Sequence, residues 1–365
     1  KDYLCFTATG ASSVTLNRNG SPADVTLQTS TDGTNWSDYA FGTAINLVDG
    51  AKVYFRNKET TTVFSKTATN NYQFALSGNV AASGNVMSLV DKDCSITDIS
   101  NASYESCFNR LLKGCTSLTA APALPATKLS SNCYQNMFYG CANLKNAPAL
   151  KATELATSCY MNMFYSCTSL TAAPDELPAE TLAESCYGSM FRECKSLETA
   201  PALPATTLAE SCYSCMFQEC TSLETAPALP ATTSAKECYR SMFRDCINLK
   251  TAKLLATSFV EVEMAMQGSC FQMFNGCTKL NSVKVAFTEW PKKHMQEWLK
   301  GVAAEGTFVC PAELNTDTRG TSTVPAGWTV TYEITANQDP DNKGNYYATF
   351  YSSSKAYKLP EGMTA

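Results

Sequence analysis

The eighteen cysteines are the first residues in this 365-residue chain whose chemistry needs an explanation. Thiols can form disulfides, bind metals or act as nucleophiles, and a high count is typical of disulfide-stapled secreted proteins. Most of the cysteines occur in pairs eight residues apart, within the phrase C-Y-x-x-M-F-x-x-C or a close variant of it. These pairs are Cys107/Cys115, Cys133/Cys141, Cys159/Cys167, Cys186/Cys194, Cys212/Cys220 and Cys238/Cys246.

The spacing argues against disulfides if each pair lies on a helix. Eight helical residues separate two Cα atoms by ~12 Å, and neighbouring helices pack ~8–10 Å apart. A disulfide requires Cα atoms ~4.4–6.8 Å apart. Because free cysteine is among the most buried residue types, we predict a ladder of buried, unbridged thiols.

Other catalytic or metal-binding chemistry has few residues to carry it. Cys212 and Cys215 form a lone C-x-x-C without the further ligands that zinc requires, so we attribute the pair to chance. His294, the only histidine, follows two lysines and is expected on the surface. Paired carboxylates remain open, because any two can meet in space, although Glu193 is expected to be solvated. No phosphate-binding loop, H-E-x-x-H or EF-hand spacing is found, and we expect no metal, no cofactor and no enzyme activity.

The cysteine pairs belong to a tandem repeat. Successive first cysteines from Cys107 to Cys238 are 26, 26, 27, 26 and 26 residues apart. A seventh copy follows after 31 residues, at 269–277, beyond an insertion at 259–267. Fixed periods of ~20–50 residues are the mark of solenoids, whose units bury their apolar faces only by stacking on each other.

Two patterns alternate within one unit. Residues on one side of a helix are expected at the spacing shown by Leu208, Cys212, Met216, Phe217 and Cys220. Segments 181–184 and 207–210 have the form of capping boxes at the start of such a helix. Prolines after the second cysteine forbid continuation of the helix, and a short strand at 223–226 can pair in parallel with the next unit. Each unit therefore predicts a strand, a turn and a helix of about three turns.

With these features, residues 95–310 resemble the BspA-like class of leucine-rich repeats found in bacterial surface proteins. The resemblance rests on the M-F, x-x, C, x-x, L pattern followed by a short strand. It departs from the family in having Pro in the strand region and Ala where larger aliphatic residues are common. The resemblance implies a right-handed α/β solenoid and a secreted or surface-anchored bacterial protein. We expect any signal or anchor segment to lie outside this sequence, which begins at Lys1 without an initiator Met.

Flanking segments complete a multi-domain α/β prediction. Residues 1–88 alternate apolar and polar residues between turn signals such as Asn19-Gly20 and Asp49-Gly50, which predicts a small all-β, sandwich-like (Ig-like) domain. Within it, residues 30–36 come near the Asp-box of sialidases, but the spacing favours a plain hairpin with a packed Trp36. Gly-, Ala- and Ser-rich residues 77–84 are expected to form the seam to the solenoid, which spans 89–335 with its caps.

Towards the C-terminus, Pro291 is expected to begin a longer helix that contains Trp290, Met295, Trp298 and Leu299. Residues 307–309 and 328–332 are expected to be strands. Residues 336–365 predict a β segment that begins a further, truncated module.

Two surface columns are the candidate binding residues. The strand column consists of residues that flank the repeated Leu, and its candidate contacts are Asn146, Thr199 and Thr225. The helix column lies six residues after each first cysteine, and aromatic residues and Arg in it are types enriched at interfaces. Its candidates are Tyr139, Tyr165, Arg192, Gln218 and Arg244. The alternative, that both columns are only solvated exteriors, stays open.

Composition narrows the partners. Hydrophobic residues make up 44% and charged residues 17%, which predicts an ordered chain. A net charge of −5 offers no electrostatic footprint for nucleic acid, and no apolar run is long enough to span a membrane. We expect non-catalytic adhesion to a host or microbial protein or glycan through the repeat surface. The alternative is a structural spacer that displays another module; an enzyme is the third and weakest reading.

Overall fold

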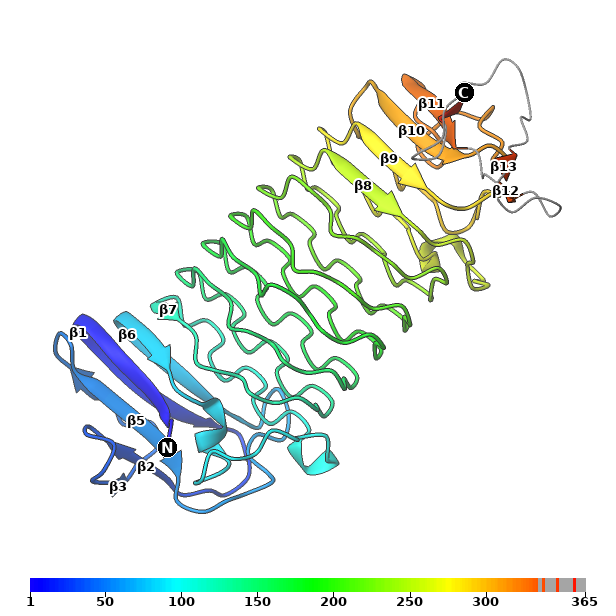
Figure 1. Ribbon diagram of the computed structural model, residues 1–365. Helices are drawn as coiled ribbons and strands as arrows, with labels where there is room; N and C mark the ends of the chain where they lie inside the picture. Colours follow the sequence, from blue (N-terminus) through cyan, green and yellow to red (C-terminus); the bar gives the residue numbers. More distant parts are fainter. Residues whose placement is uncertain (334–336, 339–345, 348–356, 359–365) are drawn as a thin grey trace.

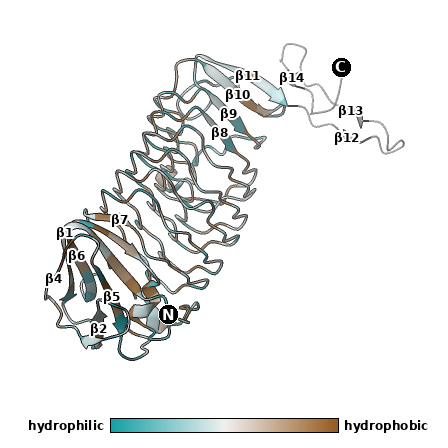
Figure 2. Cartoon of the chain, turned by 60° about the vertical axis from the view of Figure 1, so that its left-hand side comes forward, coloured by the Kyte–Doolittle hydropathy of each residue, from teal (hydrophilic) through white to brown (hydrophobic). Residues whose placement is uncertain are grey.

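A computed structural model of the protein describes residues 1–333, 337–338, 346–347 and 357–358. Stacked coils form a long column that begins on an N-terminal sheet (Figures 1 and 2). The strands are β1 (Leu4–Asn19), β2 (Leu27–Ser30), β3 (Ser37–Asp38), β4 (Ile45–Leu47), β5 (Lys52–Asn57), β6 (Asn71–Ser83), β7 (Leu118–Ala120), β8 (Thr251–Leu254), β9 (Ser282–Val285), β10 (Gly306–Pro311), β11 (Trp328–Glu333), β12 (Asn337–Gln338), β13 (Tyr346–Tyr347) and β14 (Tyr357–Lys358). Three 3₁₀ turns are η1 (Val86–Leu89), η2 (Ala102–Tyr104) and η3 (Ala265–Gln267).

The N-terminal region is one sheet that folds onto itself. Its order is β3-β2-β5-β1-β6-β7, with β4 also paired to β1. Phe74 of β6 pairs with Leu16 of β1. Leu16 lies ten residues after Phe6 in β1, so in a straight strand Phe74 would be ~33 Å from Phe6. Yet the ring centroids of Phe6 and Phe74 are 4.7 Å apart. The hairpin therefore bends sharply at a bulge, where Gly10 and Gly78 adopt φ of +78° and +69°. The N-terminal region is all β, and a single bent sheet provides both of its layers.

This sheet is continuous with the solenoid. Strand β6 pairs in parallel with β7, which belongs to the first coil. Residues 77–84, predicted as a seam, lie within or next to β6 and do not form a linker. One cluster of buried side chains runs from Leu4 to Tyr332. The N-terminal sheet thus covers the end of the first coil, which would otherwise expose its apolar side.

Parallel pairing joins the coils on one side, here called the strand side. Strands β8, β9, β10, β11 and β14 form a parallel sheet at the C-terminal end, in agreement with the strands predicted at 307–309 and 328–332. Between β7 and β8 only single bridges remain, such as Asn146 to Ala172 and Thr225 to Thr251. The strand predicted at 223–226 is reduced to such a bridge, because the prolines that follow remove backbone donors.

The predicted helices are wrong, and with them the α/β fold class. Within the described residues the only helical elements are the three short 3₁₀ turns, far below the ~20 apolar residues of a membrane-spanning helix. The segment around each cysteine pair is instead a series of tight turns, which we call the turn ribbon. In one coil, Cys159, Met161 and Met163 donate their N–H groups three residues back, at 3.1–3.2 Å. The alternate residues donate to the next coil at 2.9–3.0 Å, as Tyr160 does to the carbonyl of Cys186.

Left-handed residues recur every four positions in this ribbon. Ser158, Asn162 and Ser166 have φ of 55–57°, and equivalent triplets occur in the neighbouring coils. A positive φ at the third position of a turn is the type II geometry, which Gly and Asn favour and Asp tolerates. In this ribbon Ser and Glu also occupy such positions. Because the four-residue turn repeat nearly equals the 3.6-residue helical period, it buries residues at i, i+4 and i+8 in the same way. That coincidence explains the incorrect helix prediction.

Identical side chains stack along the ribbon. The Phe ladder, with adjacent ring centroids 5.3–5.7 Å apart, comprises Phe138, Phe164, Phe191, Phe217, Phe243 and Phe274. Trp298 extends it at 6.1 Å from Phe274. The segment after Pro291, predicted as a helix, is thus the ribbon of a further, degenerate coil, with Met295, Trp298 and Leu299 buried. Most of the predicted C-terminal module at 336–365 lies outside the described residues.

Candidate functional site

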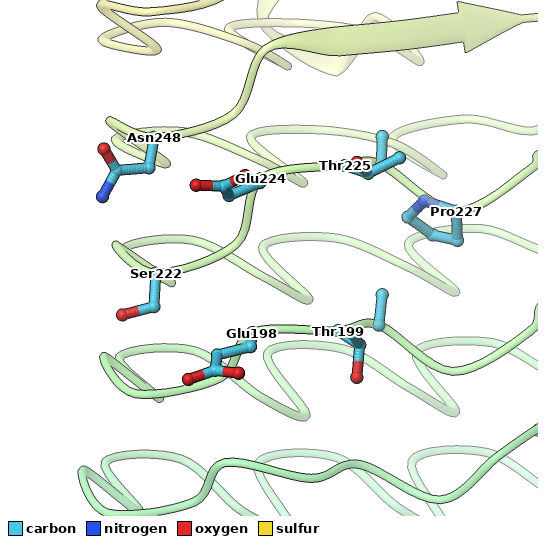
Figure 3. Close-up of a pocket in the computed structure, with 9 residues that line it drawn as sticks. Glu198, Thr199, Ser222, Glu224, Thr225, Pro227 and Asn248 are labelled. Carbon is cyan, nitrogen blue, oxygen red and sulfur yellow. The ribbon is translucent and has the colours of Figure 1, made fainter.

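The strand side contains a hollow with a volume of about 700 Å³. It spans the coils that follow Leu197, Leu223 and Leu249, and two predicted contacts, Thr199 and Thr225, line it. Figure 3 shows the pairs Glu198/Glu224 and Thr199/Thr225 in register on successive coils. The remaining lining residues are Ala200, Ser222, Ala226, Pro227 and Asn248.

Small side chains create this hollow. Ala200, Ala226 and Pro227 follow the bridge residues, and they project little beyond the backbone, so the surface sinks between the coils. A second hollow of about 510 Å³, lined by Pro174, Asp175 and others, lies along the same side. The strand side is therefore a shallow, polar and open surface.

Carboxylate, hydroxyl and amide groups line the hollow. The Lys250 ammonium donates to Glu224 Oε2 at 2.6 Å, and this hydrogen bond, with the lysine charge, lowers the pKa of Glu224. Asn248 donates its amide to the Thr221 carbonyl at 2.7 Å, which fixes its orientation. These groups can accept and donate several hydrogen bonds to a polar ligand.

The residues of the predicted helix column lie on the turn ribbon, where they contact one another. Tyr139 and Tyr165 stack with centroids 4.7 Å apart and an interplanar angle of 5°. The Lys113 ammonium lies 4.8 Å above the Tyr139 ring, and the Arg192 guanidinium lies 5.3 Å from the Tyr165 centroid. Cation–π contacts and ring stacking thus join four coils, and three of the side chains involved, Tyr139, Tyr165 and Arg192, were predicted to meet a ligand.

Glu193 completes this contact set and is not the solvated carboxylate that the sequence suggested. Its two oxygens accept hydrogen bonds from Tyr165 Oη at 2.7 Å and Ser166 Oγ at 2.8 Å. Partial burial alone would raise the pKa of Glu193, but these hydrogen bonds outweigh it and lower the pKa. Burial and the bond to Glu193 raise the pKa of Tyr165 to about 12.

Gln218 and Arg244, the last two candidates of the helix column, differ in exposure: Gln218 is buried and Arg244 is partly exposed. Gln218, expected to be accessible, is only 7% exposed and donates to Glu219 at 3.3 Å. Arg244 lies near Asp245 and donates to Gln272 at 3.2 Å. Of the eight predicted contacts, five therefore lie on the turn ribbon, and two, Thr199 and Thr225, line the hollow. Asn146 is exposed on the strand side and does not line the hollow.

Buried thiols form a ladder, as predicted, although the predicted reason fails. All eighteen cysteines are free, and only Cys94 and Cys215 are partly exposed. Because the coils are β-like, neighbours stand ~4.8 Å apart, a spacing that does not exclude disulfides. From Cys141 onwards, the second cysteine of each repeat instead donates its S–H to a carbonyl of the previous coil, as Cys167 does to Phe138 at 3.1 Å, and Cys115 donates to the Phe74 carbonyl of β6. Burial raises the pKa of Cys167 to about 12, so the thiol stays protonated.

His294 is buried, at 6% exposure, and not on the surface. It occupies the first-cysteine position of the degenerate coil, where its Nδ1 lies 3.1 Å from both the backbone N and the Oγ of Ser269. Burial lowers the pKa of His294. Since Ser269 is fully enclosed and its Oγ also donates to the Ala235 carbonyl, this pair is structural.

The remaining sequence motifs are structural as well. Cys215 of the C-x-x-C occupies a left-handed turn position, with φ of 56°, while Cys212 lies in the core. Residues 30–36 close the β2–β3 hairpin through Asp32, and Trp36 packs 4.1 Å from the Arg56 guanidinium. Across the part of the chain that the structure describes, no group of three or more His, Cys, Asp or Glu side chains is arranged to hold a metal.

Sequence reasoning missed Glu198, Glu224 and Asn248. The repeat offered a signal, because Glu198 and Glu224 directly precede the predicted Thr199 and Thr225.

Searches of family models, curated proteins and solved structures found no match to this chain.

Proposed function

We propose that this protein is a non-catalytic binding protein of the BspA-like leucine-rich-repeat type, which holds a host or microbial protein or glycan on its repeat surface. The repeated phrase C-Y-x-x-M-F-x-x-C and its stacking into regular coils support the family proposal. The ligand is bound without covalent chemistry, and contacts are spread over several coils.

The strand-side hollow carries this proposal. It crosses successive coils, has a volume of about 700 Å³ and presents carboxylate, hydroxyl and amide groups next to Thr199 and Thr225. The ribbon column, in contrast, uses its aromatic and Arg groups on its own neighbours. A ligand on the ribbon would have to displace those contacts, so we place the binding surface on the strand side.

A secreted or surface-anchored location fits the thiols. Cysteines exposed to oxidising surroundings become oxidised in proportion to their thiolate content and accessibility. Burial raises the pKa of the core cysteines, Cys159 to about 12 for example, and encloses them. The ladder can therefore remain reduced outside the cell.

A spacer role is the second candidate, and the continuity of the fold favours it. One buried cluster joins the N-terminal sheet to the last coils, and ring ladders cross the junctions between coils. Such a column would hold another module away from a surface.

Immobilised glycans and extracellular-matrix proteins, probed with the full chain, test the proposal. Binding to one class is expected. Against that probe, Thr199→Lys combined with Thr225→Lys should weaken binding by roughly tenfold or more, because the new side chains fill the hollow. Thr43→Lys, which alters an exposed threonine of the N-terminal sheet region that lines neither strand-side hollow, is the matched control.

Unchanged binding by the hollow variant would refute the strand-side assignment. If Arg192→Ala abolished binding and the hollow variant did not, the ligand would lie on the turn ribbon. If the chain bound nothing while a longer natural chain bound the same array, the spacer role would replace the binding role.

A further inference from the structure

Exposed apolar side chains gather where the repeat is interrupted. Among the described residues, the large hydrophobic side chains that remain exposed are Val48, Ile247, Val260, Met264 and Met266. Three of these five lie in the nine-residue insertion at 259–267, and both methionines are 57% exposed. Insertions in solenoids often mark a binding face, and polar-rimmed apolar patches mark interaction sites.

The insertion is held firmly by the coil that follows it. The Lys293 ammonium donates to the Val262 carbonyl at 3.0 Å. Gly268 lies so close that a Cβ there would come within 2.4 Å of the Lys293 carbonyl oxygen. The buried pair of Ser269 and His294 fixes the base of the insertion. The apolar surface is therefore presented in a set conformation, which lowers the entropic cost of association.

Beside these contacts, a hollow of about 530 Å³ lies between part of the insertion and the next coil. Its apolar lining comes from Phe259, Val260 and Val262 on one wall and from Trp290 and Pro291 on the other.

The two walls carry opposite charge. The insertion contributes Glu261 to the lining, and the facing wall contributes Lys292 and Lys293. Glu261 and Lys292 are both exposed, and the ion pairs of the described residues include neither of them.

We propose that this insertion surface binds a second copy of the chain through a two-fold interface. In such an interface the same patch meets itself, so it must be self-complementary. A two-fold axis that lies in the interface and runs along the hollow, between its two walls, places the acidic wall of each copy against the basic wall of the other. A patch of one sign would repel its own copy, whereas this one carries both signs. Met264 and Met266, which are flexible, can fill the space between the copies.

Sedimentation velocity of the full chain from roughly 1 to 100 µM tests this, a range in which weak homodimers are seen. A reversible dimer is expected. Met264→Ser combined with Met266→Ser should raise the dimer dissociation constant by about tenfold or more. Val48→Ser, which removes a 74% exposed side chain in the N-terminal sheet region, should leave it unchanged. A chain that stays monomeric throughout overturns the proposal.

Charge reversal supplies a test that misfolding cannot mimic. Glu261→Lys alone and Lys292→Glu alone each place like charges across the axis, so each should dimerise poorly. An equimolar mixture of these two variants restores both pairings and should dimerise as the unaltered chain does. If the mixture stays monomeric, or if either single variant dimerises normally, the proposed interface is wrong.

Discussion

The turn ribbon and the strand side are built from the same repeats, yet they use their side chains in opposite ways. On the ribbon, Tyr139, Tyr165 and Arg192 pack on one another, and a carboxylate from Glu193 accepts two hydrogen bonds. On the strand side, Ala and Pro leave hollows, and the exposed Thr225 lines one of them. The comparison indicates that large residues in a repeat column can signal cohesion between coils, whereas small ones can leave room for a ligand.

The largest expected loss of stability comes from a substitution in the buried Phe ladder of the turn ribbon. Phe191 is fully buried, with the rings of Phe164 and Phe217 at 5.4 and 5.7 Å. Phe191→Ala should lower the free energy of unfolding by about 3–5 kcal/mol, because it leaves a cavity. The strand-side substitution Thr225→Ala should change it by less than about 0.5 kcal/mol. Urea unfolding followed by circular dichroism measures both, and similar losses for the two would remove the distinction between the sides.

A smaller effect is expected from the left-handed positions. Asn162 has φ of 56°, so Asn162→Val should destabilise the protein by about 1–3 kcal/mol. Asn162→Gly removes the same side chain but tolerates this φ, and it should be neutral or slightly stabilising. Thermal unfolding of the pair would show whether backbone conformation decides the effect. Equal losses would mean that the asparagine side chain matters instead.

The smallest effect concerns pH. Hydrogen bonds lower the pKa of Glu193 in the folded protein, so its stabilisation is present above the usual carboxyl pKa of 4.5 and is lost as the pH falls below that value. Glu193→Gln should therefore flatten the decline of stability below about pH 4.5, by under ~1 kcal/mol. Glu224 on the strand side, paired with Lys250, should show the same sign.

Added salt should affect the stabilising contributions of Glu193 and Glu224 differently. The Glu224–Lys250 pair is largely exposed, so molar salt should erase its contribution, while that of Glu193 should persist. Stability measured against pH in low and high salt tests this. A Glu193 contribution that vanished with salt would show that the ribbon is as solvated as the strand side.

The positions of the candidate residues along the repeat could be read from the sequence more readily than their surroundings in the fold. Thr199 and Thr225 were found from their place in the repeat, and the structure brings them together in the hollow. Gln218 was expected on the surface because its column varies along the chain, but packing between coils buries it. The insertion at 259–267 was visible as a change of period, whereas the exposure of Met264 and Met266 required coordinates.

The sequence alone determined the repeat, its period, the stacking of units and the burial of Cys, Met and Phe at fixed positions. The tertiary structure decided how the backbone runs between those positions. A helix satisfies its N–H groups locally, while the ribbon sends alternate N–H groups to the next coil, as Asn162 does to Gly188 at 2.9 Å. Periodicity cannot separate the two, because a four-residue turn and a 3.6-residue helix bury the same side chains. Only the presence of a neighbouring coil at β-like spacing makes the ribbon favourable.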